Sequence, residues 1–170
     1  TVIDDFGHNP DKIGATLDTL HAFPGRLLVM FQPHGYGPLR LMGRELAETF
    51  RNKLGAADRL FLPDPAYYGG TVDRSQGSER IVSLIAAAGG KAEHIPDRED
   101  CAARIRELAR PGDLEPLCVV VELGGQAMHP AVGAALEQRQ LYAVPVVGGQ
   151  SRPADRLVEN AIRQTPRPLR

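Results

Sequence analysis

Short apolar runs alternate along this chain with longer segments in which apolar residues recur at helical spacing. The short runs predict strands at residues 2–5, 27–31, 59–62, 92–95, 117–123 and 142–147. A continuous apolar run such as Leu27–Phe31 is typical of a strand buried on both faces of a parallel sheet. We therefore expect an α/β fold, a Rossmann-like three-layer sandwich with a mostly parallel sheet of about six strands and helices on both faces.

Local signals mark where helices begin and end between these runs. Pro10 and Pro38 open two helical patterns, since proline is tolerated in the first turn. Ser78 and Asp97 are expected to cap two further helices, because their side-chain oxygens can accept from first-turn amides. Gly89-Gly90 ends the third helix. The sequence also predicts helices at residues 130–140 and 153–164.

The 170 residues suit one ordinary domain. We expect residues 1–126 to form the α/β domain, and residues 127–170 to form a divergent strand and helix extension packed on it. The chain enters an apolar strand directly from Thr1, which suggests the excised C-terminal part of a larger protein.

Charge and cysteine content exclude several classes of partner. Twenty basic and 21 acidic side chains leave a net charge of −1, so neither a nucleic acid nor an anionic membrane is an expected partner. Cys101 and Cys118 are too few for a disulfide framework or a cysteine-based zinc site. The apolar runs are too short for membrane insertion, so we expect a cytoplasmic location.

Polar and glycine-rich segments follow the predicted strands at residues 4–9, 32–36, 64–73 and 124–126. Ligand sites in parallel α/β sheets collect at the carboxyl ends of the strands. The first segment carries the most chemistry. A carboxylate of Asp5 can accept hydrogen bonds from a ribose diol, Phe6 offers a flat face to a purine, and His8 and Asn9 precede a helix N-terminus, where anions are favoured. The alternative is that Asp4, Asp5 and Asn9 only cap the helix and shape the turn.

Residues 3–11, with the sequence Ile-Asp-Asp-Phe-Gly-His-Asn-Pro-Asp, resemble the motif that opens the C-terminal domain of the Mur ligases. These are ATP-dependent amide ligases of peptidoglycan precursor synthesis, and the resemblance is greatest to the UDP-N-acetylmuramate–alanine ligase and murein-peptide ligase branch. The similarity continues in order through residues 28–36, 64–73 and 109–113. It therefore covers roughly residues 1–113.

The resemblance implies a nucleotide-binding role for four residues. Asp5 matches the aspartate that binds the ATP ribose, and Phe6 matches the aromatic residue near adenine. His8 matches a histidine on the nucleotide side of the cleft. Asn9 stands where the branch has a second histidine, as it does in the folylpolyglutamate-type ligases.

The resemblance also implies an amino-acid side of the site. His34 and Tyr36 fall where this domain faces the incoming amino acid. Gly35 replaces an arginine of the family motif, and Arg40 is a candidate to substitute for that cation. No residue of this chain is expected to be catalytic or to bind a metal.

The resemblance implies that this chain forms one side of the active site of a larger ligase. The chain has no Gly-x-x-x-x-Gly-Lys-Ser/Thr loop, so the phosphates of ATP and the Mg ligands are expected in a central domain of the same polypeptide. The partners would be the N-terminal and central ligase domains, the amino acid and a UDP-sugar substrate. The isolated chain is expected to be inactive, since ligation needs all reactants held together.

Two other classes stay open. The chain is alternatively a non-catalytic α/β binding or interaction module that keeps the fold, or a stand-alone flavodoxin-like binder of a small molecule. The latter fold has a similar order of elements, but a phosphate loop rich in Gly, Ser and Thr would then follow the first strand, where residues 5–9 stand instead. A phosphate-binding central domain encoded upstream of Thr1 would favour the ligase over the module.

Overall fold

The computed structural model describes residues 2–5, 7–22, 25–66, 73–109, 119–123 and 143–145. Strands and helices alternate through these segments, which confirms the predicted α/β class. The elements in chain order are β1 (Val2–Asp5), α1 (Pro10–His21), β2 (Leu27–Phe31), α2 (Tyr36–Lys53), β3 (Arg59–Leu62), α3 (Ser78–Ala87), β4 (Ala92–His94), α4 (Arg98–Leu108), β5 (Val119–Leu123) and β6 (Ala143–Pro145).

The strands form a parallel sheet in the order β4-β3-β2-β5-β1-β6. The predicted parallel pairing is thus confirmed. Strand β5 comes late in the chain but lies between β1 and β2, and pairs with both. The sequential path β2-β3-β4 leads away from β5 on one side, and β1-β6 lies on the other. In open α/β sheets, such a change of direction opens a crevice at the carboxyl ends of the strands.

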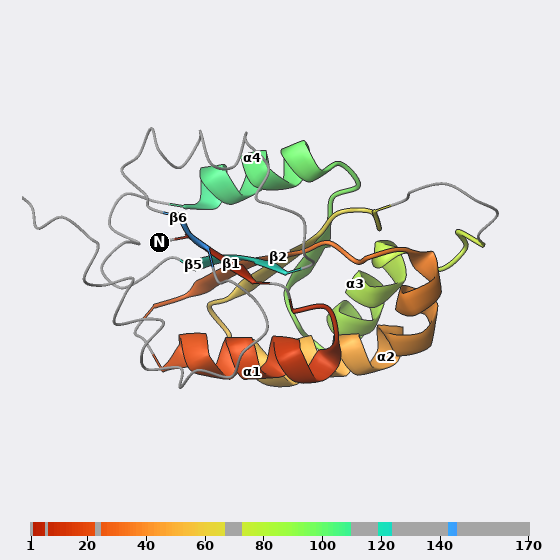
Figure 1. Cartoon of the computed structure of the whole chain (residues 1–170), viewed down its shortest axis with the longest axis horizontal. Helices are drawn as coiled ribbons and strands as arrows, with labels where there is room; N and C mark the ends of the chain where they lie inside the picture. The colour runs from red at the N-terminus through yellow and green to blue at the C-terminus, as the bar shows by residue number, and fades with distance from the viewer. Residues whose placement is uncertain are drawn as a thin grey trace, which may run out of the picture.

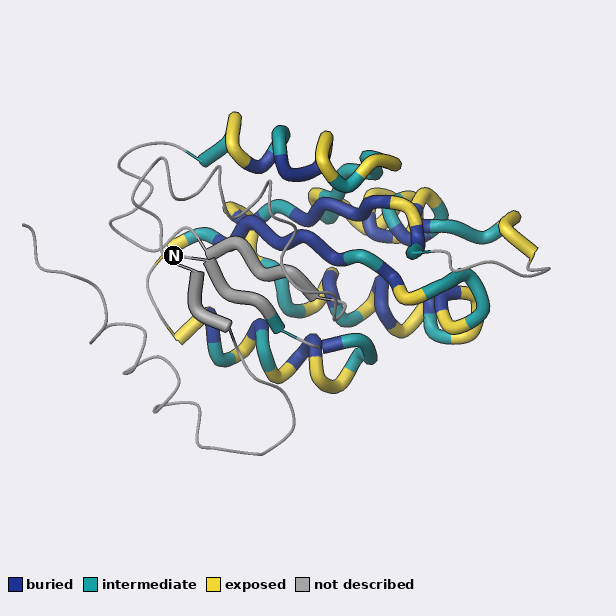
Figure 2. The backbone as a smooth tube through the Cα atoms, turned by 45° about the horizontal axis from the view of Figure 1, so that its top comes forward, coloured by how far each residue is buried: buried dark blue, intermediate teal, exposed yellow. Residues whose placement is uncertain are grey.

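Helices cover both faces of the sheet. Helices α1, α2 and α3 lie on one face, and α4 lies on the other (Figure 1). Every side chain of β2 is buried. Successive side chains of a strand point to opposite faces of the sheet, so the strand contributes apolar residues to both faces. Leu27, Val29 and Phe31 join the larger apolar cluster under α1–α3, while Leu28 and Met30 join the smaller cluster under α4. Strands β2 and β3 therefore form the buried centre of the described sheet (Figure 2).

Two of the predicted helix starts are wrong by one or two residues. Helix α2 begins at Tyr36, so Pro38 occupies its third position; a missing N–H costs little there, because first-turn amides have no intrahelical acceptor. Gly77 caps α3, and Ser78 is instead its first residue, whose hydroxyl donates to the carbonyl of Pro63 at 2.6 Å. Asp97 is confirmed as the cap of α4, since its carboxylate accepts from the amides of Glu99 and Asp100.

Several expectations fall outside the described residues. These are the helices predicted at 130–140 and 153–164, the tip of the loop at 67–72, and the glycine-rich turn at 124–126. Within the described segments, no helix has the length and apolarity needed to cross a membrane.

Candidate functional site

Asp5 is the last residue of β1, at the carboxyl edge of the sheet. Its Oδ2 atom accepts a hydrogen bond from the hydroxyl of Thr16, on α1, at 2.5 Å. This bond joins the end of the strand to the helix that follows it and sets the direction of the carboxylate. The side chain is half-buried.

Asn9 caps α1. Its Oδ1 atom accepts from the backbone amide of Lys12 at 2.9 Å, so the capping interpretation of this residue is confirmed. The cap does not test a ligand role for Asn9, because the NH₂ group of its side chain still has two N–H donors. His8, next to it, is half-buried between β1 and α1. Phe6 lies outside the described residues.

The tertiary structure brings His34 close to His8. The two residues follow β2 and β1, which are separated in the sheet only by β5. Desolvation lowers the pKa of His34 below its usual value, and the positive charge of His8 lowers it further. The two segments expected to face the nucleotide and the amino acid therefore lie within electrostatic range of each other.

Gln32 connects three elements at this edge, a role that the sequence interpretation missed. Its Nε2 atom donates to the carbonyl of Asp64, after β3, at 3.2 Å. Its Oε1 atom accepts from Nη1 of Arg98, the first residue of α4, at 3.0 Å. The amide thus holds the ends of β2 and β3 against α4, and it leads directly into the segment that carries His34.

Tyr36 and Arg40 both lie on α2, in its first two turns. Gly35, with φ at +88°, makes the left-handed turn that starts this helix. In the loop before α3, the backbone amide of Ser75 donates to Oδ1 of Asp73 at 2.9 Å. Hydrogen bonds from Ser75 lower the pKa of Asp73, and the charge of Arg40 adds to that lowering. Arg40 is therefore near an acidic side chain in the loop before α3.

A pocket of about 420 Å³ opens at the ends of β3 and β4, beside the N-terminus of α3. Its lining comes from four separate segments: Tyr36, Asp64, Arg74, Ser75, Gly77, Ser78, Glu79, Arg80, Ser83 and His94. Nε2 of His94 lies 2.8 Å from Oδ1 of Asp64. The sequence did not indicate this contact, because the two residues are 30 positions apart. Within the described segments, no group of three or more residues could hold a metal ion.

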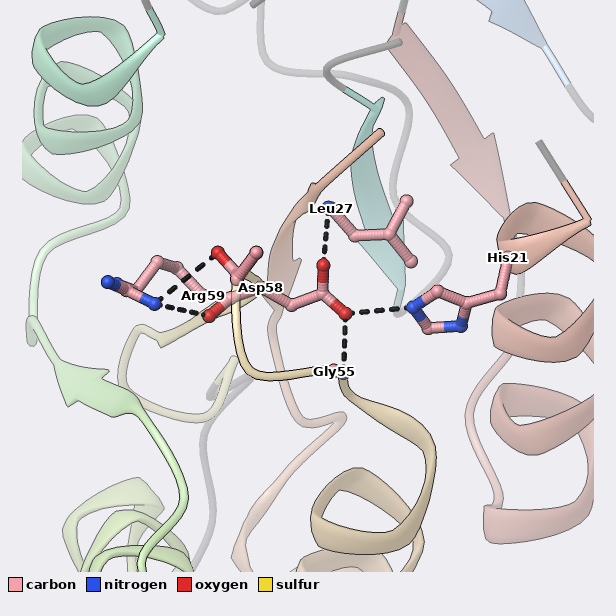
Figure 3. Close-up of polar contacts among 6 residues, drawn as sticks. His21, Leu27, Gly55, Asp58 and Arg59 are labelled. Carbon is pink, nitrogen blue, oxygen red and sulfur yellow. Dashed lines mark hydrogen bonds and ion pairs between the residues drawn. The ribbon is translucent and has the colours of Figure 1, made fainter. Parts of the chain in front are cut away.

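A second polar cluster lies at the opposite, amino-terminal edge of the sheet (Figure 3). Asp58 is only 4% exposed, and its carboxylate accepts from the amides of Leu27 at 2.7 Å and Gly55 at 2.6 Å. Its third partner is Nε2 of His21, at 2.8 Å. His21 is in the last turn of α1, where a histidine also suits the negative end of the helix dipole. The cluster joins α1, β2 and β3 at the edge away from the candidate site.

A parallel α/β domain with polar side chains at the carboxyl ends of its central strands defines a class of ligand-binding domains. The particular family follows from comparison with known proteins. The family profile of the Mur ligase, glutamate ligase domain, matches residues 1–115. The chain belongs to the Mur ligase family.

Relatives named UDP-N-acetylmuramate--L-alanine ligase are 30–38% identical to it over the aligned residues. The protein from Mycobacterium sp. (strain JLS) is 33% identical over 88% of this chain, and that from Sorangium cellulosum is 35% identical over 87%. The protein from Salinibacter ruber is 37% identical over 81%. The chain spans only 28–31% of the length of these relatives.

The fold also matches a solved structure, that of a UDP-N-acetylmuramoyl-L-alanyl-D-glutamate--2,6-diaminopimelate ligase. The TM-score is 0.60 at 19% identity, over 82% of this chain and 29% of the other. At that identity, the match supports the shared fold of the domain and nothing finer.

Proposed function

We propose that this chain is the C-terminal domain of an ATP-dependent Mur-type amide ligase of peptidoglycan precursor synthesis. In the complete polypeptide it closes over ATP held by a central domain and positions the amino-acid substrate. One observation carries the proposal. The segments that follow β1 and β2 lie on either side of β5, and His8 of the first segment is close enough to His34 of the second for its charge to lower the pKa of His34. The family match and the partial coverage of the relatives support it.

The residues present at β1 fit the nucleoside part of ATP. The Asp5 carboxylate is held by Thr16 at the carboxyl edge, and two hydroxyls of a ribose can donate to such an acceptor. His8 and the amide of Asn9 stand at the N-terminus of α1, where donors and the helix dipole favour negative charge. Phe6 would lie near adenine.

Among the described residues, no three ligating side chains lie close enough together to hold a metal ion. The ligands of the magnesium ion are proposed to lie in the central domain, as the family resemblance implies. The work proposed for this chain is to orient the ribose, to place His34, Tyr36 and Arg40 toward the amino acid, and to exclude water from the activated carboxyl group on closure.

We also propose that the part of the chain after residue 126 packs on the same domain. The parallel pairing of β6 with β1 supports this, because residues 143–145 extend the sheet next to the nucleotide-facing strand.

An amide NMR titration of the chain with Mg·ATP tests the nucleotide assignment. Saturable shifts are expected at residues 5–9 and 34, at millimolar nucleotide. Asp5→Asn should weaken the apparent affinity several-fold. Asp18→Asn is the matched control, because Asp18 lies toward the far end of α1 and is exposed. Shifts that ignore Asp5→Asn would contradict the ribose assignment, and a spectrum unchanged by Mg·ATP would favour the non-catalytic module.

A further inference from the structure

His34 stands at the centre of a three-residue turn that follows β2. The amide of Gly35 donates to the carbonyl of Pro33 at 3.1 Å, which is the hydrogen bond of a γ-turn. The same carbonyl accepts the amide of Ala66, in the segment after β3, at 2.9 Å. The turn that carries His34 is therefore tied on one side to the segment after β3.

Gln32 holds the start of this turn. Its Nε2 atom donates to the carbonyl of Asp64 at 3.2 Å, and its Oε1 atom accepts from Nη1 of Arg98 at 3.0 Å. Both halves of the side-chain amide are thus in use, and the bond to the guanidinium is of the stronger kind because its donor is charged. A side-chain amide held at both ends keeps one orientation, so the backbone that leads into the turn is held as well.

The acceptor of Gln32 is itself held in place. The amide of Asp64 donates to the carbonyl of Pro96 at 3.0 Å, and Oδ1 of Asp64 lies 2.8 Å from Nε2 of His94. Asp64 is thereby joined to the last residue of β4 and to the loop before α4. The contacts form a continuous set across the carboxyl ends of β2, β3 and β4 and the start of α4.

We infer that Gln32 is a positioning residue, which fixes the turn that presents His34 through its bonds to Asp64 and Arg98. The assignment of this turn to the amino-acid side rests on the proposed function, whereas the fixing of the turn rests on the contacts alone. The nucleotide-facing segment follows β1, which β5 separates from β2. Loss of the Gln32 amide is therefore expected to disturb the amino-acid side and to leave the nucleotide side nearly unchanged.

Gln32→Met tests the fixing of the turn, because methionine has a similar length but no N–H to donate. In amide NMR spectra of the full chain, the variant is expected to shift the resonances of residues 34–36. Exchange of the Ala66 amide with solvent should become several-fold faster, since its acceptor is held less firmly. Asn52→Leu is the matched control, because it removes an exposed side-chain amide from the last turn of α2, at the opposite edge, and should change neither.

A kinetic measurement tests the consequence in the complete ligase polypeptide, with L-alanine as the probe amino acid. Gln32→Met is expected to raise KM for L-alanine and to lower kcat/KM for it about tenfold, since small displacements of a positioned group cost that much or more. KM for ATP should change less than twofold. A variant that had only lost stability would instead lower kcat through loss of active protein and leave both KM values unchanged.

Arg98→Met and the double variant complete a mutant cycle. Each single variant also loses that residue's other contacts, so only the cycle isolates the bond that the two side chains share. The loss of kcat/KM in the double variant should be smaller than the product of the two single losses by about threefold or more.

Three results would overturn the inference. The first is a Gln32→Met spectrum with unchanged resonances at residues 34–36 and unchanged exchange of the Ala66 amide. The second is a kcat/KM for L-alanine within twofold of the parent. The third is a cycle in which the two single losses multiply. The proposed function fails separately: a complete polypeptide that consumes no ATP with L-alanine would count against it, and the NMR comparison with Asn52→Leu would still decide whether Gln32 fixes the turn.

Discussion

Nε2 of His21 lies 2.8 Å from Oδ2 of Asp58, and the contact joins the last turn of α1 to the turn before β3. The same carboxylate accepts the amides of Leu27 and Gly55. Three donors from three segments thus converge on one buried side chain. Such a convergence is expected to contribute to stability at the edge of the sheet that carries no candidate ligand group.

Asp58→Asn should lower the free energy of unfolding by about 2–4 kcal/mol, because an NH₂ group would replace an oxygen that accepts from two donors. Urea denaturation followed by circular dichroism measures this. Asp18→Asn is the control, since it removes an exposed carboxylate paired with Lys53 and should cost less than about 1 kcal/mol. Equal effects of the two variants would show that the Asp58 cluster adds no stability beyond a surface pair.

His34 should titrate below the usual histidine value, because burial and the charge of His8 both disfavour its protonated form. His8→Gln should raise the pKa of His34, but only in part, since burial, the larger cause, remains. Imidazole proton shifts followed through pH by NMR measure both effects. A pKa of His34 that does not respond to His8→Gln would show that the two segments do not meet.

The same shift predicts the sign of the pH effect on stability. The pKa of His34 is lower in the folded chain than in the unfolded chain, so the unfolded state binds more protons between the two values. The contribution of His34 to stability is therefore complete above its unfolded pKa and decreases as the pH falls below it. The free energy of unfolding should depend less steeply on pH in His34→Gln than in the parent chain. A steeper dependence in the variant would contradict this.

Cys101 should be unreactive in the folded chain. Burial, together with the negative charges of Glu93, Asp97 and Asp100, raises the pKa of its thiol to about 12. A thiol reagent at pH 8 should label it far more slowly than the unfolded chain, because almost no thiolate is present. The measurement uses a Cys118→Ser background. Fast labelling under native conditions would mean that α4 opens readily from the sheet.

Asp5→Ala in the complete ligase polypeptide should raise the KM for ATP more than it lowers kcat, because the proposed ribose contact is made before and during the reaction alike. Thr16→Val should give a smaller rise, since it removes only the hydroxyl that orients the carboxylate. Initial rates at varied ATP measure this. An unchanged KM in Asp5→Ala would reject the nucleotide role and would leave Asp5 only its contact with Thr16 of α1.

Much of the fold could be predicted from local pattern. The buried run at β2 and the cap of α4 by Asp97 match the sequence expectations, because both depend on neighbouring residues. The start of α2 was misplaced at Pro38, since proline suits any position of a first turn and the turn itself is made by Gly35. For the candidate site, the sequence indicated the segments around Asp5 and His34 but not the contacts they make.

The sequence by itself determined the alternation of strands and helices, the parallel class of the sheet, and membership of the family through its first motifs. These depend on apolar spacing and short motifs, which are properties of adjacent residues. Only the tertiary structure decided that β5 separates β1 from β2, and that Asp64 meets His94 and Asp58 meets His21. Those partners are 30 or more positions apart, and strand order alone brings them together. The order of strands is set by packing of the whole sheet, which no local pattern encodes.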